Sequence, residues 1–505
     1  MKRNTAALPM AVMLAIGCWG LDRGGMWRDE AATFQVARRT VPQIWRLLHE
    51  VDAVHGLYYL LMRPVLVVHP GEVLLRLPSV LAATATAGLV AALGTRLAAP
   101  RVGLWAGLLY AVTPMVGHYA QEGRSYALVA AGATAATLLL VRALAGRSWT
   151  AYGAVLAVTC LLHEFAVLLL LAHATTLALT RAPRRMWTRW LCAAAAVTLT
   201  VLPLALLSHA QSAQVAWLRP PGQDSVDHLV RQFAGPTNGV LVPCLLLIGV
   251  ALCRPWPTGP TGAPPLPAVA LPLLLVPPTI LMTVSQWSPL YDARYVLYAL
   301  AGAPLLIAAG ADRIARAAPR LPRATVTVAG ALAVAMVCAH QLPLLRQDRT
   351  MTHRGGDNLA TASALASREL RPGDPVLFLP SLGRRSALAY PKGFRGVRDV
   401  ALAKPAGASG TLYGVELSPE ALRRRLAGLD QVWLVAEPYA LRPNWHPETP
   451  TDRLKRALVE REFVQRREYR DAGVNLRLYE RALKGRGELR DQPQRTRGRP
   501  TTPPA

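Results

Sequence analysis

The sequence has little charge, and little of that charge is negative. Only 17% of its 505 residues are charged, whereas a soluble globular protein carries about 25%, so an ordinary soluble protein is disfavoured. The 30 acidic residues stand against 56 basic ones, of which five are lysines, and the formal net charge is +26. Nucleic-acid-binding proteins carry such charge on a soluble domain, but here the arginines lie mostly between apolar runs. This pattern indicates contact with membrane lipids and disfavours a nucleic-acid partner.

Cysteine is scarce and follows no ligand spacing. The six cysteines lie within or at the edge of apolar runs, and no two of them form a Cys-x-x-Cys pair. The sequence therefore predicts neither a disulfide framework nor a zinc site, and we expect free, buried thiols.

Apolar runs are what the sequence has in abundance, since 52% of its residues are hydrophobic. A transmembrane helix needs about 20 mainly apolar residues, and the sequence offers about eleven such runs. It therefore predicts an all-α polytopic membrane protein. The two runs 151–162 and 164–180 are short and could form one span. The candidate spans are 6–21, 73–95, 102–117, 125–144, 151–162, 164–180, 190–208, 239–253, 266–285, 295–311 and 324–342.

The arginines between the spans predict the orientation in the cell membrane. With a cytoplasmic N-terminus and eleven spans, the inner loops hold most of the arginines, as the positive-inside rule requires. The outer loops after the first contain only Arg124, Arg219, Arg231 and Arg294. No small-residue cleavage site follows Cys18–Leu21, so we expect the first span to be an uncleaved anchor.

The predicted membrane domain covers residues 1–342. Its first outer loop, 22–72, is long and contains two amphipathic stretches, Val41–His49 and Leu57–Val68. We expect both to lie in the plane of the membrane interface.

The polar content becomes ordinary after Leu342, and residues 343–480 predict a small α/β domain outside the cytoplasm. No cluster in this domain indicates catalysis, and residues 481–505 form a basic, Pro-rich tail that we expect to be disordered. The predicted elements are strands at Pro375–Pro380 and Gln431–Ala436, a helix at Pro419–Leu429 and a hairpin of Phe463–Tyr469 with Val474–Glu480.

Six polar clusters lie on the predicted outer face, whereas the inner loops have only arginines. One active site built from the outer ends of several helices would explain this distribution. The clusters are Trp27–Glu30, Asp52–Tyr59, Arg76–Ser79, His118–Tyr126, His163-Glu164 and Ser288–Tyr295.

Each cluster offers chemistry and also a plainer interpretation. Of the adjacent carboxylates Asp29 and Glu30, one could act as a general base while the other orients it. Asp29 could also cap a helix starting near Ala31. Arg124 could bind a phosphate through its planar guanidinium. Arg294 could meet an anionic ligand or pair with Asp292.

Each of the other three clusters also allows either a functional or a structural interpretation. Asp52–Tyr59 could line a site for a polar ligand or begin an interfacial helix. Arg76 could snorkel to the lipid headgroups or pair with loop acids. The pair His163-Glu164 is costly beside a membrane unless it is paired, wet or functional.

At these residues the chain resembles the polytopic GT-C glycosyltransferases. The similarity is to the bacterial family-39-like relatives of protein O-mannosyltransferases and lipid A aminoarabinose transferases, and it extends over roughly residues 20–310. Three residues depart from the usual family pattern: Gly56 replaces prolines, Gly123 an alanine and Glu164 a tyrosine. The matching motifs are Asp29-Glu30, His55-Gly56-Leu57-Tyr58-Tyr59, Arg76-Leu77-Pro78-Ser79, Tyr119-Ala120-Gln121-Glu122-Gly123-Arg124-Ser125-Tyr126-Ala127-Leu128 and Ala293-Arg294-Tyr295.

The resemblance implies transfer of a sugar, mannose or a similar one, from a polyprenyl-phosphate carrier to a glycan, lipid or protein acceptor outside the cytoplasm. It implies inversion at the sugar with Asp29 as general base and Glu30 beside it, and it implies no cofactor, with a divalent metal left open. The substrate-binding residues that it implies are Asp52, His55, Tyr58, Arg76, Gln121, Glu122, Arg124, Tyr126, His163, Arg294 and Tyr295.

Two other functions stay open. A transporter or lipid flippase would place ionisable residues at mid-span and break paired helices. Prolines do interrupt residues 272–278, but the polar clusters collect on one predicted face. A non-catalytic scaffold for the cell envelope would need no general base at all.

Overall fold

The computed structural model describes residues 5–256, 258–259, 262–317, 322–350, 359–447, 449–471 and 474–482. The chain divides into two compact units. Unit 1 consists of Met1–Arg23, Asp52–Leu61 and Gly71–Thr350, and unit 2 of Gly24–Val51, Met62–Pro70 and Met351–Ala505. The predicted first outer loop is therefore shared between them. The predicted tail lies outside the described residues from residue 483 onward.

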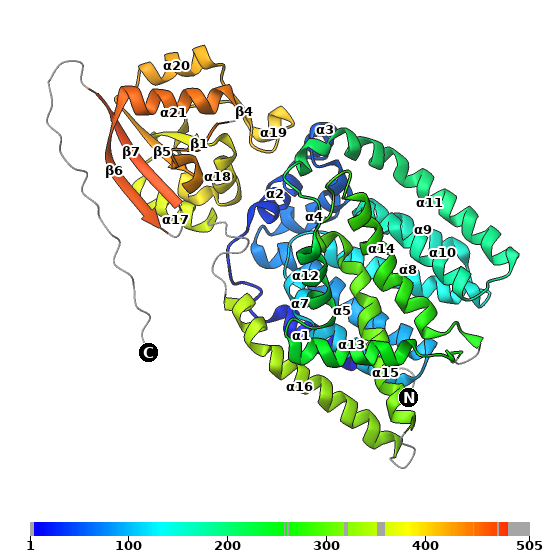
Figure 1. The fold of residues 1–505 in the computed structure, drawn as a ribbon. Helices are drawn as coiled ribbons and strands as arrows, with labels where there is room; N and C mark the ends of the chain where they lie inside the picture. Colours follow the sequence, from blue (N-terminus) through cyan, green and yellow to red (C-terminus); the bar gives the residue numbers. More distant parts are fainter. Residues whose placement is uncertain are drawn as a thin grey trace. The chain divides into compact units, whose positions relative to one another are not determined.

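Unit 1 consists of helices (Figure 1). Residues 56–61 of helix α4 (Gly56–Val68) belong to it, and the rest of that helix belongs to unit 2. The other helices of unit 1 are α1 (Ala7–Cys18), η1 (Ala53–His55), α5 (Glu72–Leu97), α6 (Pro100–Val112), α7 (Pro114–Ala120), α8 (Tyr126–Leu144), α9 (Trp149–Leu162), η2 (Glu164–Leu168), α10 (Leu169–Leu179), α11 (Arg184–Ala210), η3 (Ser212–Val215), α12 (Gln223–Ala234), α13 (Asn238–Leu252), α14 (Leu266–Val284), η5 (Ala293–Ala301), α15 (Gly302–Ala317) and α16 (Arg323–Thr350).

The prediction of a multi-pass membrane protein is confirmed. Within the described residues, six helices are long and apolar enough to cross a membrane, or seven if the bent pair α12 and α13 is one span. Four shorter apolar helices accompany them. The six are Glu72–Leu97, Tyr126–Leu144, Arg184–Ala210, Leu266–Val284, Ala293–Ala317 and Ala324–Arg349. The number of about eleven spans and the orientation stay predictions.

Helix α5 lies in the interior of unit 1, where α1, α6 and α8 pack against it. Small residues along it allow close backbone contact, as in other membrane helix bundles. A Cβ on Gly94 would lie only 3.0 Å from the Cα of Gly103 on α6. A charged contact joins Arg101 of α6 to Asp312 of α15.

Several helices of unit 1 are interrupted, and the interruptions carry polar residues. Helix α9 ends at an extended His163, after which η2 begins as a 3₁₀ helix. The chain enters α15 through a second 3₁₀ helix, η5. Tyr298 of η5 donates a hydrogen bond to the Phe165 carbonyl of η2 over 2.8 Å, which holds the two irregular segments together. Such 3₁₀ stretches often mark functional positions.

Unit 2 contains the predicted α/β domain, and the predicted strands, helix and hairpin are present. Its five-stranded sheet has the order β2-β1-β5-β7-β6, and β3 pairs with β4 in a separate ribbon. Strands β2, β1 and β5 run parallel, and β7 and β6 are antiparallel. The strands are β1 (Pro375–Leu379), β2 (Arg398–Asp399), β3 (Leu402–Lys404), β4 (Val415–Glu416), β5 (Gln431–Ala436), β6 (Phe463–Asp471) and β7 (Val474–Arg481).

Helices cover both faces of this sheet (Figure 1). Leu377 and Leu434 pack on the face beneath α20 and α21, whereas Val376 and Trp433 pack on the face beneath α17. This alternation follows from the two-residue repeat of a strand. The helices that lie wholly in unit 2 are α2 (Arg28–Ala37), α3 (Val41–Glu50), α17 (Leu359–Glu369), η7 (Ser381–Arg384), α18 (Arg385–Ala389), η8 (Pro391–Phe394), α19 (Ala406–Ser409), α20 (Pro419–Ala427), η9 (Pro438–Leu441) and α21 (Pro450–Glu462).

The segment Gly24–Val51 belongs to the same compact unit as the α/β domain. Arg39, which follows α2, donates to the carbonyls of Thr411 and Leu412 over 2.9 and 3.3 Å. The Met26 amide donates to the Tyr390 hydroxyl over 2.6 Å. Two stretches far apart in the sequence therefore form one body.

One expectation about the thiols is wrong. All six cysteines are free, as predicted, but Cys18, Cys192 and Cys253 are exposed rather than buried. An apolar helix that crosses a bilayer directs one side toward lipid rather than toward protein. An apolar run therefore does not imply burial within the protein.

Candidate active site

Five predicted site residues come together in unit 1, and we call His55, Arg124, Tyr126, His163 and Tyr295 the histidine–arginine cluster. They come from η1, the turn before α8, the first residue of α8, the break between α9 and η2, and η5. The His163 ring lies 4.9 Å from the Tyr295 ring, 5.8 Å from the Tyr126 ring and 6.5 Å from the His55 ring, measured between centroids. Four separate polar motifs of the sequence therefore share one buried site.

The contact between Arg124 and His55 fixes the state of the histidine. Arg124 Nη2 lies 2.6 Å from His55 Nε2. A guanidinium can only donate, so Nε2 accepts and the ring proton is on Nδ1. Burial first, and then the positive charge of Arg124, lower the pKa of His55 well below its usual value. His55 is therefore neutral near pH 7 and offers Nδ1–H as a donor.

Two ring nitrogens of the cluster lack a hydrogen bond. His55 Nδ1 and His163 Nδ1 are both buried, and neither has a partner among the residues that the structure describes. Leaving a buried polar group unsatisfied costs roughly 1–3 kcal/mol. Such atoms favour a polar ligand or an ordered water at this position.

Arg294 borders the cluster and contacts two aromatic rings. Its guanidinium carbon lies 5.7 Å from the centre of the Tyr126 ring and 5.5 Å from that of Tyr295. Asp292 is also close, with its carboxylate 3.4 Å from Arg294 Nε. The predicted local pair with Asp292 is thus present, and it holds a cation beside the histidines.

The turn that carries Arg124 is held by its neighbours. Gln121 donates to the carbonyls of Gly17 and Trp19 over 2.7 and 2.9 Å, and the Ser79 hydroxyl donates to the Glu122 carbonyl over 2.6 Å. These contacts give Gln121 a positioning role. The buried Glu122 side chain belongs to the same turn.

A close contact with α5 explains why position 123 is a glycine in this chain. A Cβ at this position would lie 2.5 Å from Cγ of Leu75. The turn therefore approaches α5 closely enough that the alanine of the usual family pattern would require a shift.

Arg76 is fully buried, so it does not snorkel to the lipid headgroups. It donates to the carbonyls of Leu21 and Arg23 over 3.1 and 2.9 Å. These bonds join α5 to the segment after α1.

The loop with Asp52 is held by residues that the sequence analysis missed. Asp52 has a left-handed backbone conformation with φ of 59°, which Asp tolerates better than most residues. Its amide donates to Gln214 over 3.2 Å, and the Ala53 amide donates to Gln211 over 3.0 Å. Tyr59 donates to the Asp52 carboxylate over 2.8 Å. The pair Gln211 and Gln214, just after the predicted span 190–208, was the sequence signal that could have predicted these contacts.

Tyr58 and Glu164 lie beside these groups without joining the ring contacts of the cluster. The Tyr58 side chain is fully buried next to Tyr59. Glu164 accepts a hydrogen bond from Ser208 of α11 over 2.8 Å. The pair His163-Glu164 is thus divided, because the histidine belongs to the cluster and the glutamate contacts α11.

Asp29 and Glu30 lie in unit 2, in the first turn of α2. The helix begins at Arg28, so the interpretation of Asp29 as the cap of a helix starting near Ala31 is wrong. Carboxylates in a first turn are stabilised by the helix dipole. Glu30 is fully buried, whereas Asp29 is partly exposed. Their convergence with the histidine–arginine cluster stays a prediction.

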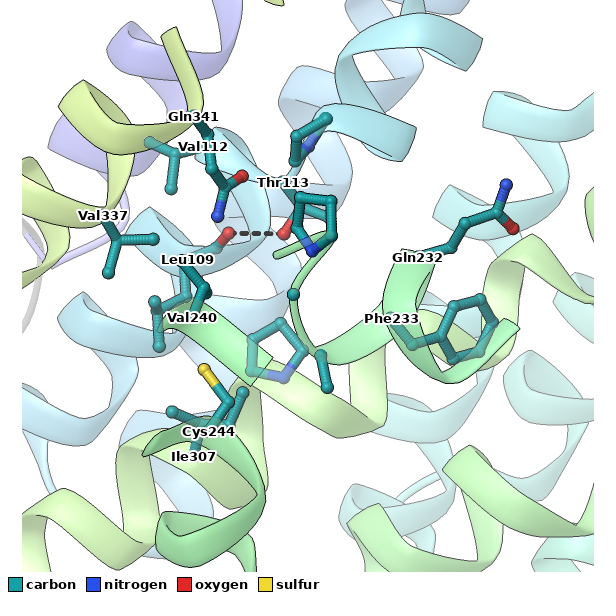
Figure 2. Close-up of a pocket in the computed structure, with 15 residues that line it drawn as sticks. Leu109, Val112, Thr113, Gln232, Phe233, Val240, Cys244, Ile307, Val337 and Gln341 are labelled. Atoms are coloured by element: carbon teal, nitrogen blue, oxygen red, sulfur yellow. Dashed lines mark hydrogen bonds between the residues drawn. The ribbon is translucent and has the colours of Figure 1, made fainter. Parts of the chain in front are cut away.

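No group of three His, Cys, Asp or Glu side chains that could hold a metal ion occurs among the described residues. A small cavity lies apart from the cluster, near the bend between α12 and α13 (Figure 2). It has a volume of about 20 Å³, enough for about one water. Its lining is uncharged and includes Thr113 and Gln341.

Comparison with known proteins identifies the fold. Residues 57–207 match the family model of the dolichyl-phosphate-mannose-protein mannosyltransferases. Among solved structures, the chain is similar to ArnT from Cupriavidus metallidurans in the apo state, with 15% identity, a TM-score of 0.58 and coverage of 94% of this chain and 97% of that chain. The chain has a GT-C glycosyltransferase fold.

The structure of the same ArnT bound to undecaprenyl phosphate matches with 15% identity, a TM-score of 0.59 and the same coverage of 94% and 97%. No curated protein matches the chain significantly. The predicted resemblance to family-39-like GT-C proteins is confirmed.

Proposed function

We propose that this GT-C protein transfers a sugar from a polyprenyl-phosphate carrier to an acceptor outside the cytoplasm, and that the histidine–arginine cluster binds the donor phosphate. The observation that carries the proposal is the pair of buried histidines without partners at Nδ1, beside Arg124. Arg294 supplies a second cation.

The chemistry of the cluster suits a phosphate that becomes more negative during the reaction. His55 donates from Nδ1 to a phosphate oxygen, and Arg124 provides charge-assisted hydrogen bonds. When the bond between the sugar and the phosphate breaks, the departing phosphate gains charge, which fixed donors in a buried site stabilise. The Tyr126 and Tyr295 rings give the site apolar faces for the sugar ring.

The acceptor is activated by Asp29 in this proposal. The carboxylate takes the proton of the acceptor hydroxyl, the acceptor oxygen bonds to the anomeric carbon, and the bond from that carbon to the phosphate oxygen breaks. Polyprenyl phosphate leaves from the opposite face, so the configuration inverts, as in inverting glycosidases. The partial exposure of Asp29 fits the base better than the fully buried Glu30, which we assign to orienting α2.

The donor assignment has support from the comparisons. A protein of the same fold has been solved with undecaprenyl phosphate, and the matching family model is named for a dolichyl-phosphate-mannose donor. We infer a polyprenyl-phosphate sugar, with mannose as the first candidate and a glycan, lipid or protein as acceptor.

The test uses membranes that contain the full-length protein and radiolabelled polyprenyl-phosphate-mannose, with other lipid-linked sugars in parallel. We expect a labelled product with the unchanged protein and none with Asp29→Asn, although that variant inserts normally. Asp22→Asn is the control, because it neutralises an exposed carboxylate nearby in the sequence. Full activity of Asp29→Asn, or no transfer from any donor by the inserted protein, contradicts the proposal.

A further inference from the structure

A second cavity in unit 1, of about 370 Å³, lies where the arginine-rich ends of α5, α13 and α15 meet. The positive-inside rule predicts that these ends lie on the cytoplasmic side. None of the residues that line it belongs to the histidine–arginine cluster, so it is a separate feature. Its lining combines Asp312, Arg313 and Arg316 with apolar residues such as Leu97 and Leu266.

The charges at this cavity do not balance. The Asp312 carboxylate is buried and contacts two guanidinium groups, those of Arg101 and Arg316, the second over 2.8 Å. Arg313 donates to the Cys253 carbonyl over 2.6 Å, which is a neutral acceptor. Asp312 is therefore shared by two arginines, and Arg313 of the same lining contacts only a neutral group among the described residues, so the excess of positive charge favours an anion.

Donors remain available on these arginines. A guanidinium has five N–H groups, and the contacts above engage Nε of Arg316 and Nη1 of Arg313. Within the part of the chain that the structure describes, the other nitrogens of these two side chains have no hydrogen-bond partner. They can bind phosphate oxygens without breaking an existing contact.

The rest of the lining distinguishes a lipid from a free anion. Leu97, Ala98, Ala251, Leu266 and Ala309 give the cavity hydrocarbon walls, which a dissolved phosphate would not use. The loop beside it, which contributes Pro255, also carries Arg254 with its guanidinium 5.1 Å from the centre of the Trp256 ring. Tryptophan and arginine at a helix end are typical of the membrane interface.

We propose that this cavity binds the phosphate headgroup of an anionic phospholipid, with Arg313 and Arg316 as its ligands and the apolar wall against the start of the acyl chains. Basic pockets between membrane helices bind anionic headgroups in this way. The site is independent of sugar transfer and fixes a lipid at the arginine-rich end of the bundle.

The test measures lipid binding by the purified full-length protein in detergent. Dihexanoyl phosphatidylglycerol is titrated and bound lipid is counted by native mass spectrometry. We expect saturable binding that weakens about tenfold in the double variant Arg313→Gln, Arg316→Gln. The variant Arg313→Lys, which keeps the charge, should retain binding.

The control is the double variant Arg147→Gln, Arg185→Gln, which removes two exposed arginines of the same predicted side outside the cavity. Equal binding by this control and the cavity variant overturns the proposal. Equal binding of dihexanoyl phosphatidylcholine also overturns it, because that lipid has no net charge. Displacement by millimolar inorganic phosphate would show a free-anion site instead, and so would overturn the lipid assignment.

Discussion

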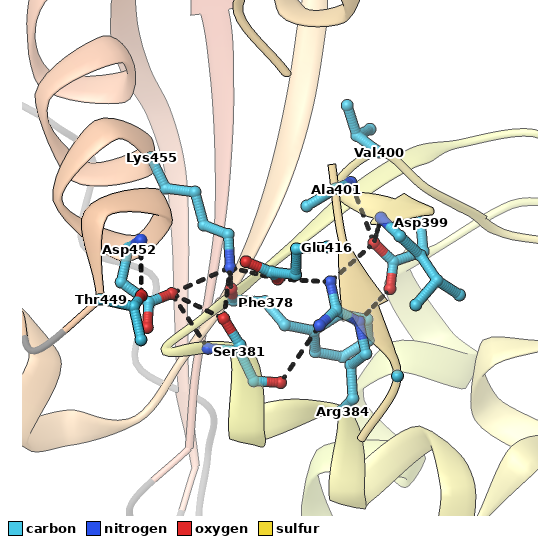
Figure 3. A network of polar contacts seen from close by, with 12 residues as sticks. Phe378, Ser381, Arg384, Asp399, Val400, Ala401, Glu416, Thr449, Asp452 and Lys455 are labelled. Atoms are coloured by element: carbon cyan, nitrogen blue, oxygen red, sulfur yellow. Dashed lines mark hydrogen bonds and ion pairs between the residues drawn. The ribbon is translucent and has the colours of Figure 1, made fainter. Parts of the chain in front are cut away.

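Two buried polar groupings in this protein differ in how completely their members are paired. In unit 2, Lys455 donates to the Phe378 carbonyl, the Ser381 hydroxyl and the carboxylates of Glu416 and Asp452 over 2.5 to 3.0 Å (Figure 3). In unit 1, His55 and His163 each keep a buried nitrogen without a partner among the described residues. One grouping is complete within the protein, and the other is not.

The unit 2 network lies at the carboxyl ends of the parallel strands, where α/β proteins often bind ligands. Arg384 there donates to Asp399 over 2.5 Å and contacts Glu416 over 2.6 Å. No buried polar atom of this network lacks a partner in the part of the chain that the structure describes. A position that often binds ligands can thus be filled by the protein's own side chains, whereas unsatisfied buried groups indicate which site takes a ligand.

The largest effect should come from breaking the complete network. Lys455→Met leaves the buried Asp452 without its cation and leaves Glu416 with Arg384 alone, so we expect unit 2 to lose about 3–5 kcal/mol of unfolding free energy. Urea unfolding of the full-length protein, followed by hydrogen exchange at β1 and β5, measures this loss. Arg466→Met is the control, because its ion pair with Glu480 is exposed on both sides and contributes about 0–1 kcal/mol. Similar losses in both variants would show that the network does not stabilise the domain.

Substitutions in the histidine–arginine cluster should change activity rather than stability. Arg124→Gln removes the cation beside His55, and we expect sugar transfer to fall about 100-fold while the protein still inserts. The transfer assay on membranes measures it, and Arg219→Gln, an exposed arginine of the predicted outer side, should remain active. Full transfer by Arg124→Gln would remove this residue from the site.

A smaller effect is expected where the turn carrying Arg124 approaches α5. Gly123→Ala places a methyl group against Leu75, which should cost about 1–3 kcal/mol and shift the neighbouring guanidinium. Thermal unfolding in detergent and the transfer assay together measure both consequences. Gly249→Ala is the matched control, since a Cβ there has no neighbour within 4 Å. Identical behaviour of the two variants contradicts the close approach.

The smallest expected difference between the two polar groupings is the pH at which each loses stability on acidification. The pKa of His55 is lowered by burial and by Arg124. As pH falls below about 6.5, His55 therefore takes up a proton in the unfolded chain before it does so in the folded protein, and the free energy of unfolding falls. Burial would raise the pKa of Asp452, but Lys455 holds it below 3.8. The stabilisation by Asp452 is therefore complete above its unfolded pKa and is lost only as pH falls through the lower folded pKa.

Hydrogen exchange resolved by unit, between pH 7 and pH 4, tests this order. We expect the amides near His55 to lose protection at a higher pH than those of β1. Substitution of His55 by Gln, which does not titrate, should remove the early loss. The reverse order, or an early loss that persists in this variant, would contradict the assignment of neutral His55.

Much of the fold follows from local patterns. Runs such as 73–95 and 266–285 gave the long helices, because an apolar run of this length has few other stable environments. The strand Gln431–Ala436 and the hairpin at 463–480 were readable from β-rich segments bounded by turns. Helix α16 extends to Thr350, beyond the predicted span, because its polar last turns carry no hydropathy signal.

Composition and short motifs were enough to predict the class of protein and to propose candidate site residues, because both act locally along the chain. The neutral state of His55, the support of the Asp52 loop by Gln211 and Gln214, and the place of Gly24–Val51 with the α/β domain came from the fold. Those properties depend on which atoms meet across tens or hundreds of residues, and no local pattern records such contacts.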